Sequence, residues 1–403
     1  MPKSLSPSTI AVVQASVPAL VAHGEAITAE MYRRLFQTDH IRDLFNHGNQ
    51  GEGGSQGKAL AGAILAYASN IENLAALAPA VERIAQKHIG YDIRPEHYPF
   101  VADALLGAIG HVLGEAATPD VLNAWGEAYW FLADILQARE ATIREDLAAQ
   151  DGGWKGWRKF VVTQKVRESA VITSFTLAPV DGGPLLRHRP GQYLTFTLRP
   201  AGQEAIKRNY SISCAPNGKA YRISVKREDH GLASRYLHDE VQVGTVLEAT
   251  PPAGEFYLAD APARPVLLLS GGVGLTPMVS MMETIAAAHP DVEVHYVHGA
   301  LNSTTHAMGE HVRGLARAHG RTSVATFYSE PAAHDVLGQS YDADGFITTD
   351  WLAANTPLHE ADIYLCGPKP FLRAVVGGLS KAGVDAQRIH YEFFGPADEA
   401  LAA

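Results

Sequence analysis

The chain has 403 residues, which is too long for one ordinary hydrophobic core and predicts two or three domains. Its formal net charge of -10 excludes nucleic acid as the main partner, because phosphate binding needs a basic face. Two cysteines, Cys214 and Cys366, can form neither a disulfide framework nor an iron–sulfur cluster. With no signal-like opening and no apolar run of membrane-spanning length, we expect a cytoplasmic protein without integral membrane association.

Residues 1–147 have the pattern of an all-helical domain. Apolar residues recur at helical spacing over 120–147, and Ser6 followed by Pro7 is a favourable helix start. The glycine-rich segment 48–57 predicts a loop between two helices.

Polar residues interrupt the apolar stripes of these predicted helices. His88 continues one stripe, and Glu140 lies one turn after Leu136 on another. A buried carboxylate needs a partner, because burying it unpaired costs several kcal/mol. Tyr98 could complete a His–Glu–Tyr network, in which the carboxylate fixes the imidazole tautomer as it does beside metal ligands. The alternative from these residues alone is a satisfied core histidine.

A second group of polar residues lies on the preceding helices. Tyr32 shares a stripe with Leu35 and Phe36, and Gln56 precedes Leu60 by one turn. A hydroxyl and an amide directed into an apolar pocket could bind a small ligand. Equally, both could be polar ends of core side chains that reach backbone groups.

A linker at 148–157 (containing DGGWKGW) leads to a strand-rich part at 158–260. KFVVTQKV, SFTLAPV, QYLTFTLRP and YRISVKRE are short segments between turn residues, which predicts an antiparallel β-barrel. Arg208 in RNYS could pair with a phosphate and Tyr210 could stack on an aromatic ring, although a cross-strand Arg–Tyr pair is the alternative. GLASRYL (231–237) predicts a glycine turn and a helix N-terminus that could bind phosphate.

Residues 261–403 alternate apolar strands with helical stretches, which predicts an α/β domain with a parallel sheet. LLLSGGVGLTP (267–277) has the pattern of a strand, a glycine turn and a helix N-terminus suited to pyrophosphate. YLCGPKPF (364–371) is a second such turn, with Cys366 at the strand end where ligands of open sheets lie. Alone, the first could be a plain turn and the cysteine a small buried hydrophobe.

Taken in order, RNYS, GLASRYL, GGVGLTP and CGP resemble the ferredoxin–NADP reductase superfamily over residues 155–403. The resemblance implies that Arg208 binds the FAD pyrophosphate and that Ser211 lies near flavin N5. It implies that Tyr193 and Tyr210 contact the flavin, and that Phe394 of the terminal EFFGP stacks where nicotinamide enters. Its other cofactor-binding positions are Asn209, Ser234, Gly271, Gly272, Val273, Gly274, Leu275, Thr276, Pro277, Cys366, Glu392, Phe393, Gly395 and Pro396.

The N-terminal domain resembles a globin through YASNIENL (67–74), AQKH (85–88) and the order of its polar residues. Together with the reductase part and the joining GGWKGWR, it resembles a bacterial or fungal flavohaemoglobin. This implies haem b with His88 as the iron ligand, and Tyr98 and Glu140 as its charge-relay partners. It implies that Tyr32 and Gln56 face bound dioxygen. The other positions that it implies are Phe45, packed on the porphyrin, Leu60, and Lys87, which with Glu392 tunes the haem and flavin potentials.

The resemblance implies a nitric oxide dioxygenase that takes electrons from NADH or NADPH through FAD and detoxifies nitric oxide. Its partners would be nitric oxide and dioxygen, with no obligatory protein partner and a monomeric chain. Minor nitric oxide or alkyl hydroperoxide reductase activity belongs to the same expectation. One alternative is a flavin reductase whose helical domain docks an acceptor without haem. Another is a haem-based sensor of dioxygen or nitric oxide, which would need an output domain.

Overall fold

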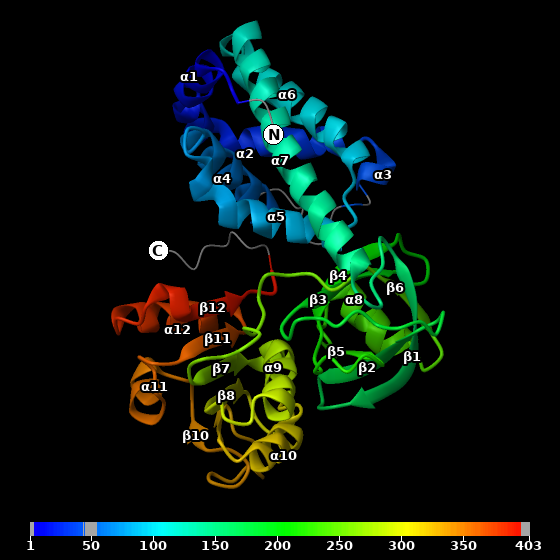
Figure 1. Cartoon of the computed structure of the whole chain (residues 1–403), viewed down its shortest axis with the longest axis vertical. Coiled ribbons are helices and arrows are strands. Elements are labelled where there is room, and N and C mark those ends of the chain that lie inside the picture. Colours follow the sequence, from blue (N-terminus) through cyan, green and yellow to red (C-terminus); the bar gives the residue numbers. More distant parts are fainter. Residues whose placement is uncertain (1–3, 43, 45–54, 396–403) are drawn as a thin grey trace. The chain divides into compact units, whose positions relative to one another are not determined.

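The computed structural model describes residues 4–42, 44 and 55–395, except for the side chains of residues 55–59 and Leu74 (Figure 1). Contacts divide the chain into two compact units. One consists mainly of the residues up to Ala149, and the other mainly of residues Gln150 to Gly395.

The first unit is all-helical, as the sequence predicts. Ser6 accepts a hydrogen bond from the Thr9 amide at 3.1 Å and Pro7 follows it, so the predicted helix start is confirmed. Among the described helices none alone is long and apolar enough to cross a membrane, although α1 and α2 pass that test together as a bent pair. The helices are α1 (Pro7–Ala15), α2 (Val17–Leu35), α3 (Asp39–Arg42), α4 (Ser55–Ser69), α5 (Ala78–Gly90), α6 (Tyr98–Leu113) and α7 (Pro119–Ala149).

The long helix α7 organises this unit. It has 31 residues and packs against α1, α5 and α6, while α2 packs against α4 and α6. The main core contains Ile27, Ile109 and Trp125, all almost completely buried. Residues of α7 therefore contact both the first helix of the unit, α1, and the helices α5 and α6 that come shortly before it in the chain.

The second unit begins with an antiparallel sheet in the order β4-β3-β6-β1-β2-β5. A bridge between Ile212 and Ile223 joins its two outer strands, which closes the sheet into the predicted barrel. Its strands are β1 (Arg158–Arg167), β2 (Ile172–Pro179), β3 (Tyr193–Leu198), β4 (Ile206–Ser211), β5 (Tyr221–Lys226) and β6 (Val246–Ala249). Between β5 and β6 lie the short helix α8 (Leu232–Arg235) and a π-helical turn (Tyr236–Glu240).

The remainder of this unit is a parallel sheet in the order β10-β9-β8-β7-β11-β12, with helices on both faces, which confirms the predicted α/β fold. Leu268 of β7 packs in the core that contains α9, whereas Leu267 and Leu269 pack in the core that contains α12. The strands are β7 (Val266–Gly271), β8 (Val294–Ala300), β9 (Thr322–Tyr328), β10 (Ala343–Asp344), β11 (Asp362–Cys366) and β12 (Ile389–Glu392). The helices are α9 (Leu275–Ala288), α10 (Gly309–His319), α11 (Thr349–Asn355) and α12 (Lys369–Lys381).

The strand order reverses between β7 and β11, and this switch point is where open α/β sheets bind ligands. Both predicted glycine turns leave the sheet there. They are in direct contact, because a Cβ atom on Gly274 would overlap the backbone carbonyl of Cys366. Only glycine permits this approach of the two chains.

Replacement of Gly274 by alanine should therefore displace this turn. We expect Gly274→Ala to destabilise the protein by about 1–3 kcal/mol, as substitutions at overpacked sites do. The temperature at which flavin is released, followed by its fluorescence, should fall by several degrees. Gly377→Ala on α12 is the matched control, because its Cβ meets no atom within 4 Å. It should be neutral or stabilising. An equal effect of both substitutions would contradict the close approach.

Candidate functional site

A buried network joins α5, α6 and α7 through His88, Tyr98 and Glu140. His88 lies in the last turn of α5, Tyr98 begins α6, and Glu140 on α7 is 0% exposed. The Nδ1 atom of His88 lies 2.6 Å from Glu140 Oε1 and 3.2 Å from the Tyr98 hydroxyl. The Tyr98 hydroxyl donates to the same Glu140 oxygen at 2.6 Å. The structure thus brings together the three residues that the sequence places on separate helices.

This network determines which nitrogen of His88 can bind a ligand. Nδ1 donates to the Glu140 carboxylate, so Nε2 is the nitrogen that remains. Burial, and then the neighbouring Glu140 charge, raise the pKa of Tyr98, so its hydroxyl keeps its proton and donates. An imidazole oriented in this way by a carboxylate is the donor set of a haem iron with one protein ligand.

Sequence reasoning missed one neighbour of this network, Arg144. Its Nη1 atom lies 3.8 Å from Glu140 Oε2, an oxygen that has no hydrogen-bond partner among the described residues. Arg144 also donates to the backbone carbonyl of Ile93. The available signal was its position one helical turn after Glu140, which puts both residues on one face of α7.

The candidate ligand-facing residues are only partly described. Tyr32 on α2 is largely buried and stacks on Phe36, with ring centroids 5.5 Å apart. Burial raises the pKa of Tyr32 to about 12, so its phenol is a donor at neutral pH. Leu60 packs against the same core. Phe45 and the side chain of Gln56 lie outside the described residues, and Lys87 is exposed beside His88.

The candidate flavin residues lie on the neighbouring strands β3 and β4. Tyr193 begins β3 and Ser211 ends β4. Their chain neighbours are hydrogen-bonded, because the Ile212 amide donates to the Gln192 carbonyl at 2.9 Å. Ser211 is 5% exposed, and its hydroxyl has no hydrogen-bond partner among the described residues. Because buried hydroxyls are normally paired, this one fits a polar group of a bound cofactor.

The other residues predicted on this side have mixed environments. Tyr210 lies 6.1 Å from the ring of Phe196, and Asn209 accepts a hydrogen bond from Thr195. Arg208 donates to the Lys207 carbonyl at 2.8 Å. The Ser234 hydroxyl accepts from the Glu228 amide and donates to the Gly231 carbonyl, so it shapes the turn before α8.

The candidate nucleotide turn is a single 3-10 turn, Gly272–Gly274, between β7 and α9. Gly271 ends β7, Val273 packs on the core, and Thr276 donates to the Val273 carbonyl at 3.1 Å. Leu275, Thr276 and Pro277 form the buried first turn of α9. Free N–H groups at such a helix start can bind an anion.

Cys366 and the C-terminal residues border the same switch point. Cys366 is completely buried, and burial raises the pKa of its thiol, so it is an inert thiol and not a nucleophile. Glu392 ends β12, Phe393 packs on the core, and Phe394 is 46% exposed. Gly395 is exposed, and Pro396 lies outside the described residues.

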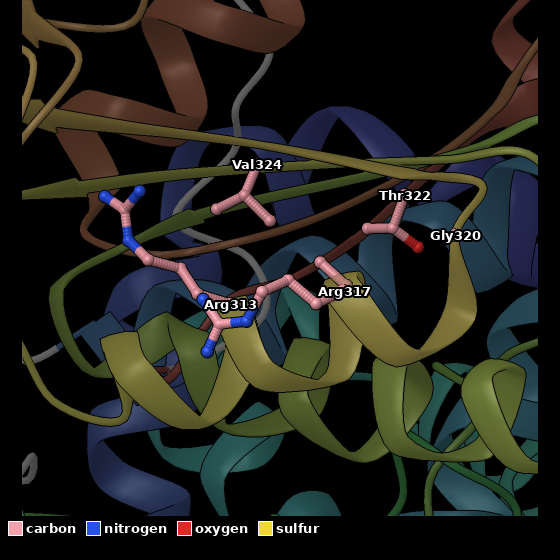
Figure 2. Close-up of a pocket in the computed structure, with 6 residues that line it drawn as sticks. Arg313, Arg317, Gly320, Thr322 and Val324 are labelled. Carbon is pink, nitrogen blue, oxygen red and sulfur yellow. The ribbon is translucent and has the colours of Figure 1, made fainter.

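A shallow hollow elsewhere contains none of these residues (Figure 2). Arg313 and Arg317 of α10 line it together with Gly320, Thr322 and Val324. Thr322 is the first residue of β9, so the hollow lies at the N-terminal ends of the parallel strands. The glycine turns lie at the opposite, C-terminal ends. We assign it no role.

Three family models match consecutive parts of the chain. They are the globin model at residues 29–136, the oxidoreductase FAD-binding domain at 159–257 and the oxidoreductase NAD-binding domain at 268–377. They confirm the predicted class of NAD(P)H-dependent oxidoreductase with haem, FAD and a nicotinamide dinucleotide as cofactors.

Several relatives and one solved structure match the chain over nearly its whole length. A flavohemoprotein from Xylella fastidiosa is 57% identical over 404 residues, covering 100% of both chains. One from Rhodopirellula baltica is 46% identical and covers 99% of this chain and 100% of the relative. The crystal structure of a flavohemoglobin from Malassezia yamatoensis with bound FAD and heme has a TM-score of 0.86 and 25% identity, over 98% of this chain and 100% of that one. The FAD/NAD binding domain of a Vibrio cholerae nitric oxide dioxygenase is 40% identical with a TM-score of 0.54, over 61% of this chain and 100% of that one.

If the Ser211 hydroxyl binds the cofactor, its removal should weaken FAD binding without lowering the stability of the flavin-free protein. Ser211→Ala should leave the flavin-free protein equally stable or slightly more stable, because no internal hydrogen bond is lost. It should weaken FAD binding by about 2- to 10-fold, the equivalent of one hydrogen bond. Urea denaturation of the flavin-free protein and FAD titration measure the two effects.

Ser224→Ala is the control for this test. The Ser224 hydroxyl is buried and lies 2.8 Å from the hydroxyls of both Ser174 and Ser213. Its loss should destabilise the flavin-free protein by about 1–2 kcal/mol. The ligand interpretation of Ser211 fails if Ser211→Ala is as destabilising as Ser224→Ala.

Proposed function

Because the chain belongs to the flavohaemoprotein family, we propose that it is a nitric oxide dioxygenase that detoxifies nitric oxide. For each NAD(P)H oxidised, two molecules of nitric oxide and two of dioxygen give two nitrate ions and one proton. The observation that carries the proposal is the 2.6 Å hydrogen bond between His88 and the buried Glu140 carboxylate. The similarity to the FAD/NAD binding domain of a Vibrio cholerae nitric oxide dioxygenase supports the same activity.

When bound, haem supplies an iron that takes up dioxygen, and FAD divides the two electrons of a hydride into single electrons. His88 would hold the iron through Nε2, because Glu140 and Tyr98 occupy the Nδ1 side. The charge-assisted hydrogen bond from Nδ1 to Glu140 would push electron density through the imidazole toward a bound iron, which would favour activation of dioxygen over its reversible carriage.

The other residues bind and orient. When haem is bound, the Tyr32 hydroxyl would donate a hydrogen bond to a small ligand on the iron, and Gln56 would be a second donor. Phe45, Leu60 and Lys87 would contact the haem. Tyr193, Arg208, Tyr210 and Ser211 would hold FAD. The turn from Gly272 to Pro277 would hold the pyrophosphate of the nicotinamide dinucleotide, and Phe394 would lie against the flavin where nicotinamide must enter.

We further propose that the protein acts in the cytoplasm as a monomer with small-molecule substrates. Both cysteines are free and buried, as suits a reducing compartment. Electron donor and acceptor domains belong to one chain, so no protein partner is needed for the transfer.

The direct test measures the absorption spectrum and nitric oxide consumption of the purified protein in one cuvette, before and after NADH is added. We expect a Soret band, flavin absorbance and oxygen-dependent formation of nitrate. Flavin absorbance without a Soret band would favour the haem-free reductase. A Soret band with negligible nitric oxide consumption would favour the sensor.

His88→Ala tests the ligand assignment. We expect the Soret band to disappear while NADH–dye reduction, which needs only the second unit, stays within about twofold of wild type. The control is His23→Ala, because His23 is an exposed histidine of the same helical unit. Retention of haem by the His88 variant would show that another residue binds the iron.

Tyr32→Phe tests the donor on the ligand side. A hydrogen bond to a polarised ligand contributes about 1.5–3 kcal/mol, so we expect dioxygen to dissociate about 10- to 150-fold faster. Stopped-flow mixing of the reduced protein with dioxygen measures the rate constant. Tyr67→Phe is the matched control, because the Tyr67 hydroxyl donates to the Ala128 carbonyl at 2.7 Å. It should lower stability and leave dioxygen release unchanged, and equal dissociation rate constants in the two variants would contradict the role of Tyr32.

A further inference from the structure

Two polar side chains of α9 bind the backbone that follows β4. The Ser280 hydroxyl donates to the Cys214 carbonyl at 2.7 Å. The Ala215 amide donates to Glu283 Oε2, also at 2.7 Å. Ser280 and Glu283 are three residues apart and therefore lie on one face of the helix. Two successive backbone groups of the barrel are thus held by two side chains of the α/β domain.

The other oxygen of Glu283 binds two further donors. Arg222 Nη2 on β5 lies 2.7 Å from Oε1, and His311 Nε2 on α10 lies 2.8 Å from it. Arg222 also donates to the Ser213 carbonyl, beside the segment that Glu283 holds. Burial alone would raise the pKa of Glu283, but the hydrogen bond from His311 and the Arg222 charge hold it below its usual value. The side chain is therefore a carboxylate that joins the barrel to two helices of the α/β domain.

The surroundings exclude water from the Ser280 contact, whereas the Glu283 side chain is partly buried, with 16% of it exposed. Ser280 is 0% exposed, and His188, which is 4% exposed, lies with its Nε2 atom 2.9 Å from the same Cys214 carbonyl. Burial lowers the pKa of His188 to about 4, so it is a neutral donor. Apolar residues of the barrel, including Phe256 and Leu258, pack in one cluster with the methionines of α9. Hydrogen bonds are strong in such surroundings.

The two ends of this contact continue directly into the candidate cofactor sites. The segment 213–215 follows Ser211 of β4, whose residues hold FAD in the proposed function. The helix α9 follows the turn Gly272–Gly274, which holds the nicotinamide dinucleotide. Hydride transfer needs reacting atoms about 3–3.5 Å apart, and a displacement of about 1 Å can cost about 100-fold in rate.

We propose that Ser280 and Glu283 are positioning residues for hydride transfer, which hold the nucleotide turn at the correct distance from the flavin strand through the backbone of residues 213–215. The inference rests on the NAD(P)H-to-FAD half of the proposed reaction and is independent of nitric oxide chemistry. A purely structural role for the same contacts would lower stability without a selective effect on the hydride step.

The test is anaerobic stopped-flow reduction of the FAD-loaded full-length protein by NADH. The limiting rate constant reports hydride transfer, and its dependence on concentration gives the Kd for NADH. We expect a 3- to 10-fold lower limiting rate constant in Glu283→Gln and in Ser280→Ala, and about a 100-fold loss in the Ser280→Ala/Glu283→Ala double variant. The Kd should stay within about twofold, because the nucleotide turn keeps its own contacts. With C4-deuterated NADH the isotope effect should remain or increase.

Glu293→Gln is the matched control. Glu293 forms a pair with His295 at 2.8 Å in the same domain, and its side chain is 46% exposed. It should leave the limiting rate constant unchanged. The proposal is wrong if both single variants reduce the flavin at the control rate, or if their loss lies entirely in Kd. If the double variant does not retain FAD, the two single variants decide. Failure of nitric oxide consumption with normal flavin reduction would concern the proposed function alone.

Discussion

The arrangement of the helical unit depends on one buried charge, the carboxylate of Glu140. It has no exposed surface, so its desolvation must be offset by hydrogen bonds from other elements. His88 from α5 and Tyr98 from α6 supply them to one oxygen, and Arg144 lies beside the other. The hydrogen bonds that offset the burial of this charge also fix the imidazole, so structural stability and the orientation of the proposed iron ligand depend on one set of contacts.

The reductase unit depends on a comparable constraint of a different kind. Two glycine turns meet at the switch point of the parallel sheet, and the backbone of one would collide with any side chain on Gly274. This approach leaves no room for a side chain at Gly274. The polar contacts that connect the turn to the barrel lie further along α9, at Ser280 and Glu283. The proposed nucleotide-binding turn and the proposed positioning residues thus occupy successive parts of the chain, at the start of α9 and further along it.

Much of this organisation could be predicted because it is periodic or local. The continuous apolar run of β7 predicts a strand buried on both faces, and its alternate residues enter two separate cores. The spacing of His88 and Glu140 on apolar stripes predicts burial, and burial of a charge predicts a partner. The sequence could not identify Arg144 or Glu283 as participants. Arg144 lies only one turn from Glu140, but an exposed arginine on a helix has the same local pattern. The partners of Glu283 are distant in sequence.

By itself, the sequence determined the helical, barrel and α/β parts, because hydrophobic periodicity and glycine turns are local properties. The candidate iron ligand came from the resemblance of its motifs to a known family. Only the tertiary structure decided that Tyr98 and His88 share a single oxygen of Glu140, and that the Ser211 hydroxyl is buried without a partner. It also decided that Ser280 and Glu283 connect α9 to the backbone of Cys214 and Ala215, which follows β4. Hydrogen-bond partners depend on distances and angles between separate elements, and these exist only after the cores have packed.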